Sequence, residues 1–157
     1  MYTTQIPMSP GGLVRSWEHV GAADWVDVLA TFPLFSSVPK RRLRKLVQLA
    51  TFGEYGTGES VIEKGGRSDS LYVILGGSAM VRGTPRSRAL RIGDYFGELG
   101  VLGDADRSAT VVATDELHLI RLPRQSFLRL AQEDPAISLR MLSNLGLHFR
   151  QLETQAV

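Results

Sequence analysis

No cysteine occurs among the 157 residues of this chain, and histidine occurs only three times. Without cysteine, neither a disulfide framework nor a thiolate metal site can form, and a reducing cytoplasm is the simplest expected setting. Only His118 falls in the central part of the sequence, whereas His19 and His148 lie near its ends. A metal-binding jelly-roll enzyme needs two or three inward histidines, so we expect no metal site.

Long apolar runs and a strong charge of one sign are also absent. The apolar stretch at residues 71–75 is far shorter than the roughly 20 residues of a membrane-spanning helix, so we expect no membrane span. The formal net charge is only +2, which by itself indicates no particular partner. There is no Gly-x-Ser-x-Gly motif, and no serine has an arguable histidine and aspartate around it. We therefore expect no catalytic residues and no enzyme activity.

Glycine, in contrast, is abundant and concentrated. Twelve of the sixteen glycines fall between Gly53 and Gly103, where short apolar runs alternate with turn residues about every ten positions. That spacing is typical of an all-β roll or barrel. It predicts strands at residues 50–55, 59–63, 70–75, 78–82, 89–91, 109–113 and 116–122.

The flanks of this segment have helical spacing. Residues 22–30 carry Trp25, Val26, Val28 and Leu29, and residues 40–49 repeat Leu43, Leu46 and Leu49 as an apolar face. Residues 124–133 and 135–153 are also helical in pattern, with Asp134 as a cap and Pro135 in the first turn.

The predicted fold class is therefore α+β: an antiparallel β-roll, jelly-roll-like and of the double-stranded β-helix type, with helices on both sides. The length suits one domain. We expect a flexible Thr-, Pro- and Gly-rich tail at 1–20, then a single domain at 21–157. Within it, helices occupy 22–50, the β-roll 50–122, and further helices 124–154.

The segment at 96–110 carries the polar chemistry. Glu98 and Leu99, followed by Val101 and Leu102, predict one short helical turn with free N–H groups that favour an anion. The glycines at 97 and 100 let a ligand approach the backbone. Arg107 offers a fork of donors to a phosphate, and Glu98 can accept hydrogen bonds from a sugar hydroxyl. A carboxylate for ribose and an arginine for phosphate indicate a nucleotide.

This segment resembles the phosphate-binding cassette of the cyclic-nucleotide-binding domain family. The shared pattern is Phe-Gly-Glu-Leu, then small or apolar residues, a loop, and Arg-Ser-Ala-Thr at residues 107–110. The similarity covers roughly residues 34–152. Gly100 and Ser108 make the chain most similar to bacterial members, of the catabolite-activator and channel-domain types. Asp106 and Gly100 depart from the eukaryotic kinase cassettes, which have proline and alanine there.

The resemblance implies a role for each matching residue. Glu98 and the Gly97 backbone would hold the ribose 2′-hydroxyl. Val81 and Leu90 would form the floor under the base, and Arg150 or Leu152 on the last helix would cover it. The cyclic phosphate would be held by Arg107 and Ser108 with the backbone amides of Leu99, Gly100 and Ala109.

The function implied is that of a regulatory cyclic-nucleotide sensor whose ligand moves the C-terminal helices. The aliphatic floor favours cAMP over cGMP, and no other cofactor is expected. The alternative is an interaction module that keeps the fold without binding the ligand. The effector domain or partner protein is unknown, and a homodimer through the C-terminal helix is possible.

One further motif stands apart from the cassette. Residues 40–45 include five basic residues in six, a pattern that can indicate nucleic acid or acidic lipid as a partner. On an amphipathic helix, however, such residues usually form a solvated face. We therefore expect nucleic acid not to be a partner of this chain.

Overall fold

The computed structural model describes residues 2–3, 22–66, 69–82, 87–98, 101 and 109–155. Its helices are α1 (Ala22–Thr31), the 3-10 turn η3 (Pro33–Phe35), α2 (Lys40–Leu49), α4 (Arg124–Glu133) and α5 (Pro135–Gln155). Its strands are β1 (Tyr2–Thr3), β2 (Thr51–Tyr55), β3 (Ser60–Ile62), β4 (Ser70–Gly76), β5 (Ala79–Arg82), β6 (Arg88–Leu90), β7 (Tyr95–Phe96), β8 (Thr110–Ala113) and β9 (Leu117–Pro123).

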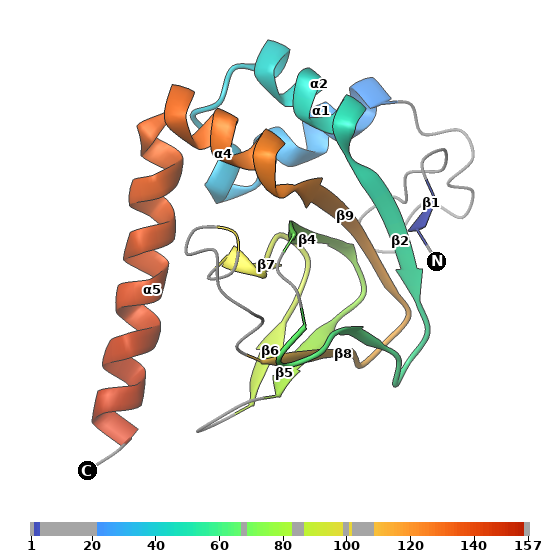
Figure 1. Ribbon diagram of the computed structural model, residues 1–157, viewed down its shortest axis with the longest axis vertical. Helices are drawn as coiled ribbons and strands as arrows, with labels where there is room; N and C mark the ends of the chain where they lie inside the picture. Colours follow the sequence, from blue (N-terminus) through green and yellow to red (C-terminus); the bar gives the residue numbers. More distant parts are fainter. Residues whose placement is uncertain are drawn as a thin grey trace.

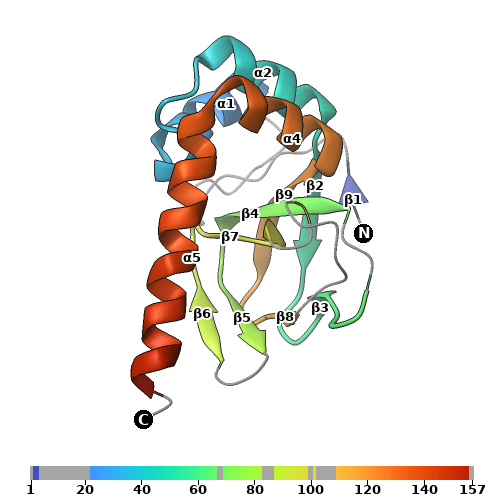
Figure 2. The same cartoon turned by 60° about the vertical axis from the view of Figure 1, so that its left-hand side comes forward.

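The strands form two antiparallel sheets, ordered β1-β2-β9-β4-β7 and β3-β8-β5-β6. They face each other as a roll, and α1, α2 and α4 cover one end of it (Figure 1). Helix α5 leaves that helical end and runs along the side of the roll (Figure 2). The predicted antiparallel β-roll with helices on both sides is confirmed.

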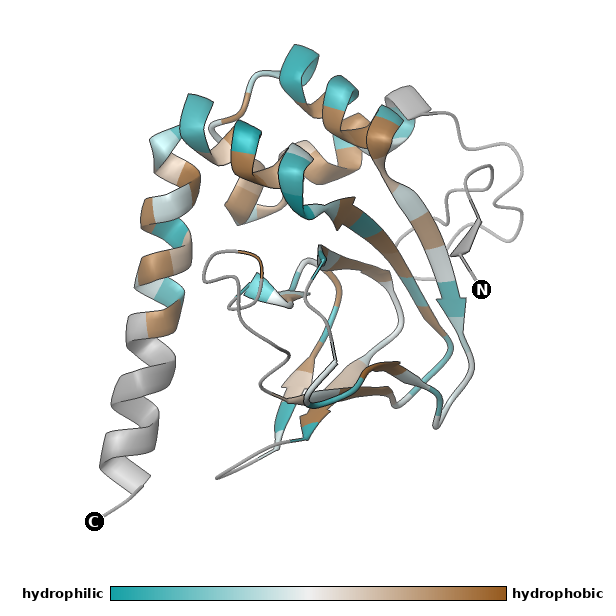
Figure 3. Cartoon of the chain, viewed as in Figure 1, coloured by the Kyte–Doolittle hydropathy of each residue, from teal (hydrophilic) through white to brown (hydrophobic). Residues whose placement is uncertain are grey.

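The strands β4 and β9 lie at the centre of the larger sheet, and every residue of β4 is buried. Because successive side chains of a strand point to opposite faces, such a strand serves two cores. Leu71 and Val73 pack with the helices, whereas Tyr72 and Ile74 pack inside the roll. This is why apolar residues occur on both faces of β4, and Figure 3 shows brown segments along both central strands, although β9 also carries His118 and Arg121.

The helices bury one stripe each, and one sequence prediction about α2 is wrong. Its buried residues are Leu43, Leu46 and Val47, whereas Leu49 is 57% exposed. A helix turns about 100° per residue, so Val47 lies about 40° from Leu43 while Leu49 lies about 120° from it. The Leu49 side chain therefore projects away from the core and lies near α4.

The start of α5 is fixed to the helical end of the molecule. The Asp134 carboxylate accepts a hydrogen bond from the Ala136 amide at 3.2 Å, as the predicted cap should, and another from Ser37 Oγ at 3.2 Å. Arg140 donates to Ser37 Oγ at 2.7 Å and to the Leu34 carbonyl at 3.4 Å. These contacts tie α5 to the loop after η3.

Two short strands were not predicted from the sequence. Tyr2 and Thr3, which lie within the predicted tail, pair with Gly53 and Phe52 of β2. Tyr95 and Phe96 pair with Val73 and Tyr72 of β4. Among the described residues, no helix is long and apolar enough to span a membrane.

Candidate functional site

The Gly97-Glu98 pair follows directly from β7, which positions it. Phe96 is buried and stacks on Tyr72 of β4, with ring centroids 5.0 Å apart. Gly97 then adopts φ of +88°, a left-handed conformation that favours glycine. The chain enters a helical turn there, because the Val101 amide donates to the Gly97 carbonyl at 3.2 Å. The short turn predicted from the sequence is thus confirmed at its described residues, 98 and 101.

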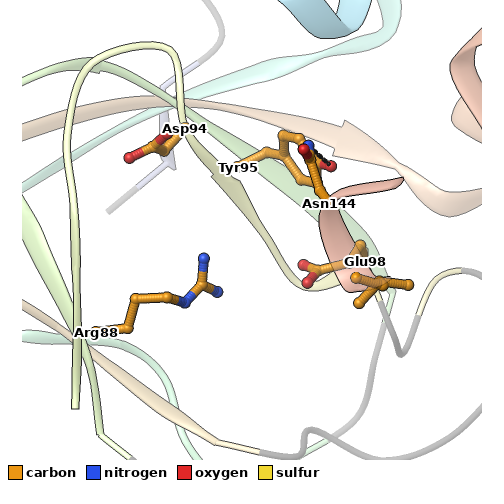
Figure 4. Close-up of a pocket in the computed structure, with 6 residues that line it drawn as sticks. Arg88, Asp94, Tyr95, Glu98 and Asn144 are labelled. Carbon is orange, nitrogen blue, oxygen red and sulfur yellow. Dashed lines mark hydrogen bonds between the residues drawn. The ribbon is translucent and has the colours of Figure 1, made fainter. Parts of the chain in front are cut away.

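Glu98 is a buried carboxylate, only 9% exposed, at the wall of a pocket. The pocket has a volume of about 140 Å³ and lies between the roll and α5. Its described lining consists of four charged or polar groups from the roll and two residues of α5, namely Arg88, Asp94, Tyr95, Glu98, Asn144 and Leu145. In Figure 4, the Arg88 guanidinium and the Glu98 carboxylate point into the same space from opposite sides.

The register of β5 and β6 shows how Arg88 reaches the pocket. Val81 pairs with Arg88, and Ala79 pairs with Leu90. Because residues two apart on a strand share a face, Arg88 and Leu90 point the same way, and Val81 beside them does too. Leu90 is buried in the core of the roll and Val81 packs against that core. The two predicted floor residues therefore share the inner face with an arginine.

Asp94 belongs to the turn that leads into β7. Its carboxylate accepts a hydrogen bond from the Arg91 amide at 2.9 Å, and its own carbonyl accepts one from the Ile74 amide at 2.9 Å. The turn is thereby tied to β4. Asp94 contributes a fixed negative charge to the rim of the pocket.

A hydrogen bond across the pocket joins the roll to α5. Asn144 Nδ2 donates to the Tyr95 hydroxyl oxygen at 2.7 Å (Figure 4). Burial raises the pKa of the Tyr95 phenol, and the negative charges of Glu98 and Asp94 raise it further. The hydrogen bond from Asn144 and the positive charge of Arg88 oppose that rise. The phenol therefore stays protonated at neutral pH and keeps its proton for an acceptor.

The residues predicted for the site are partly covered by the described structure. Glu98 lines the pocket and Gly97 directly precedes it, Val81 and Leu90 lie on the inner face of the roll beside Arg88, and Ala109 immediately precedes β8. Leu99, Gly100, Arg107 and Ser108 lie outside the described residues. Arg150 and Leu152 belong to α5, but their side chains are outside the described part.

Four polar residues of the described pocket lining, Arg88, Asp94, Tyr95 and Asn144, were not predicted from the sequence. Arg88 could have been found from its spacing, because it lies two residues before Leu90, although the predicted strand at 89–91 began one residue after it. Tyr95 gave no signal, since a two-residue strand has no alternation to detect. Asn144 depends on how α5 lies against the roll, which a helical pattern alone does not determine.

The pocket offers a carboxylate, a guanidinium, a phenol and an amide around one space. Such groups can recognise a polar ligand through hydrogen bonds. Among the described residues, no group of three or more His, Cys, Asp or Glu side chains could hold a metal ion.

Comparison with known proteins connects this site to a family. The family model of the cyclic nucleotide-binding domain matches residues 52–134. A cAMP-dependent protein kinase regulatory subunit of Eremothecium gossypii is 37% identical over 106 residues, which is 66% of this chain and 23% of that protein. The chain spans a quarter or less of the length of such curated relatives.

Solved structures share the fold. PKAR CBD2 with bound Sp-2Cl-cAMPS superposes with a TM-score of 0.73 at 25% identity, covering 84% of this chain and 91% of that one. The catabolite activator protein of Thermus thermophilus superposes with a TM-score of 0.66 at 23% identity, covering 78% and 61%. The family match spans more than half of the sequence and includes β7 and Glu98. The chain therefore belongs to the cyclic nucleotide-binding domain family.

Proposed function

We propose that this chain is a regulatory sensor that binds a cyclic nucleotide and transmits its occupancy through α5. The observation that carries the proposal is the buried Glu98 carboxylate, which follows the left-handed Gly97 in a pocket that α5 closes. A carboxylate at the wall of a pocket can accept hydrogen bonds, and the hydroxyl of a ribose is a donor of the kind it can accept from. The family membership and the relatives' names support the same ligand class.

The phosphate end of the ligand is assigned to Arg107, Ser108 and the amides of Leu99, Gly100 and Ala109, as the family resemblance implies. The chain itself acts as a binding module and carries no catalytic step. Its output belongs to an effector domain or a partner protein that the nucleotide-dependent position of α5 would control. A ligand can shift that position only by its difference in affinity for the two states.

Thermal unfolding in the presence of cAMP, cGMP and cyclic dinucleotides tests the ligand class. A ligand at 100 times its dissociation constant stabilises the folded state by about 2.7 kcal/mol. For a domain of this size that raises the unfolding temperature by roughly 5 to 10 °C. If none of these ligands raises it, the alternative holds, which is an interaction module that keeps the fold without the nucleotide.

Arg107→Ala tests the phosphate clamp. Loss of the guanidinium would leave a desolvated phosphate without its partner, at a cost of about 3 to 5 kcal/mol by analogy with a broken buried ion pair. Calorimetry should show an affinity at least a hundredfold weaker, with the fold retained. Arg44→Ala on α2 is the matched control, because it removes the same charge far from the pocket. An Arg107→Ala protein that binds as well as the parent would contradict the clamp.

We propose cAMP as the messenger, because the floor residues Val81 and Leu90 are aliphatic. The second candidate is cGMP, and one observation favours it: Arg88 shares the inner face with these two residues. Guanine presents two acceptors, O6 and N7, which suit a bidentate arginine, whereas adenine presents an amino donor beside its N7.

The ratio of the two dissociation constants decides between the messengers. A bidentate arginine contact discriminates by about 1 to 3 kcal/mol, or roughly tenfold to a hundredfold. If cGMP is the ligand, Arg88→Leu should remove a preference for cGMP of that size. If cAMP is the ligand, the parent protein binds cAMP more tightly and Arg88→Leu leaves that preference intact. Arg82→Leu, exposed at the end of β5, is the control.

A further inference from the structure

The basic segment of α2 lies along a groove between α2 and α4 that shares no described lining residue with the nucleotide pocket. Two adjoining hollows of about 120 and 280 Å³ are formed between α2 and α4, and they share Arg42, Lys45 and Glu133. We call them together the α2–α4 groove. The sequence suggested only a solvated basic face here, whereas the structure shows a concave one.

The groove is strongly cationic compared with the rest of the chain. Arg41, Arg42, Lys45 and Arg129 line it, and Glu133 is the one carboxylate in its described lining. That excess of three positive charges in one place exceeds the net charge of +2 of the entire chain. Such local concentration raises the potential in a cleft and attracts a partner of opposite charge.

Most of these cations form no ion pair with the described residues of the groove. Arg42 is held, because its Nε lies 3.5 Å from the Glu133 carboxylate and its Nη1 donates to the Glu133 carbonyl at 3.1 Å. The other three cations, Arg41, Lys45 and Arg129, are exposed and make no ion pair within the described part of the chain.

Apolar surface lies among these cations. Leu46 and Leu130 are buried beneath the groove, and Leu49 stands at its rim with 57% of its side chain exposed. A leucine in this position leaves apolar area in water that a partner could cover, at roughly 25 cal/mol per Å². Cations around one exposed leucine therefore favour a partner with carboxylates on either side of an apolar side chain.

Other polyanions match this arrangement less well. A nucleic acid backbone presents phosphates but no protruding apolar side chain to occupy a narrow hollow. An anionic membrane is contacted by several apolar side chains that project from one face, whereas Leu49 is the one exposed apolar side chain in the described lining of this groove. A peptide chain can present both carboxylates and an apolar side chain on one short segment.

We propose that the α2–α4 groove binds an acidic peptide segment of a partner protein. Its carboxylates pair with Arg41, Lys45 and Arg129, and an apolar side chain of the segment packs against Leu49. The binding involves none of the residues of the nucleotide pocket and does not depend on the proposed cyclic-nucleotide function.

A library of random 12-residue peptides, displayed on phage and selected against the full chain, tests the proposal. The peptides recovered should be enriched in aspartate and glutamate around a leucine, isoleucine or phenylalanine. One recovered peptide is then synthesised with a fluorescent label for polarisation measurements. Recovered peptides without acidic enrichment would overturn the proposal.

The triple variant Arg41→Gln, Lys45→Gln, Arg129→Gln should bind the labelled peptide about tenfold to a hundredfold more weakly, because three exposed ion pairs contribute modestly each. The matched control, Arg44→Gln, Arg82→Gln, Arg91→Gln, removes the same charge from exposed positions outside the groove. It should keep the parent affinity within about threefold. Equal losses in both variants would mean general charge attraction and would overturn the proposal.

A second pair of variants tests the proposal if the triple variant folds poorly. Leu49→Gln removes the apolar rim and should weaken the peptide severalfold, whereas Leu139→Gln, equally exposed on α5, should not. Vesicles containing phosphatidylserine and a DNA duplex serve as competitors. If either displaces the peptide at a lower concentration than unlabelled peptide does, the groove is a lipid or nucleic-acid site and the proposal is wrong.

Discussion

The first turn and the middle of α5 lie in contrasting surroundings. At the helical end, Trp25, Phe35 and Phe127 are fully buried in one apolar cluster that also takes up Ile137 of α5. Beside the roll, the same helix meets a pocket built from Arg88, Glu98 and Tyr95. Apolar burial stabilises the fold, whereas polar groups around a pocket contribute little net stability and much specificity. We therefore expect stability and binding to be separable by mutation.

The largest effect should come from the apolar side. Trp25→Ala removes a fully buried side chain that contacts Phe52, with ring centroids 5.9 Å apart. The cavity and lost burial should lower the free energy of unfolding by about 3 to 5 kcal/mol. Chemical denaturation measures this, and nucleotide affinity of the folded fraction should stay within about twofold. Leu139→Ala, at an exposed site, should change stability by less than about 0.5 kcal/mol.

The next effect should come from the pocket, in binding rather than in stability. Glu98→Gln keeps the shape but removes the charge, and hydrogen bonds to charged groups contribute about 1.5 to 3 kcal/mol. Calorimetry should show nucleotide affinity weakened by about tenfold to a hundredfold. Glu54→Gln, exposed on β2, should bind like the parent. Retained affinity in Glu98→Gln would remove the basis for a ribose contact.

A smaller effect is expected where the two regions meet. Tyr95→Phe removes the hydrogen-bond acceptor for Asn144. Because the Asn144 amide is exposed and can bond to water instead, the free energy of unfolding should fall by only about 0.5 to 1.5 kcal/mol. Amide hydrogen exchange in α5 should become about two- to tenfold faster, while α4 stays unchanged. The double variant Tyr95→Phe, Asn144→Ala should lower the free energy of unfolding by no more than the more destabilised of the two single variants does. Additive losses would mean that the two residues act separately.

The smallest effect concerns pH. Burial lowers the pKa of His118 below its ordinary value, against a smaller rise from Glu116 and Glu54. The unfolded chain then binds the proton at higher pH than the folded chain does. Stability is therefore fully present above about pH 6.5 and is lost as the pH falls through the interval below it. His118→Gln should reduce this loss of stability between about pH 7 and 5, as measured by chemical denaturation at each pH. An unchanged dependence of the free energy of unfolding on pH would contradict the prediction.

The sequence was informative where the pattern is local. The bounds of α2 and α4 follow from residues at helical spacing and from the prolines before them, and the Asp134 cap acts over two residues. The cassette was recognised because its glycines, Glu98 and the Arg107 motif lie within one short segment. Local chemistry of this kind needs no knowledge of what packs against it.

The rest depends on contacts between distant segments. The strand at Tyr2 and Thr3 exists through pairing with residues about fifty positions away. Arg88 lines the pocket because its strand pairs with β5 in one register, and Asn144 because α5 lies against the roll at one height. For Leu49 the local pattern itself misled, because it placed the residue on the buried face of α2 whereas the side chain is exposed. Residues spaced three apart fall about 60° short of a full helical turn at each step, so the third leucine leaves the apolar face.

The attachment of α5 at its first turns has a mechanical consequence. The helix is held near Asp134 and Arg140 and touches Tyr95 through Asn144, roughly 14 Å along its axis from Pro135, while Gln155 lies about 30 Å along it (Figure 1). If the helix turns as a rigid rod about Pro135, its far end moves through a longer arc than its middle. If the proposed ligand moves the helix at Asn144, the displacement at Gln155 is about twice as large, and a partner that detects this motion should contact the far end of the helix.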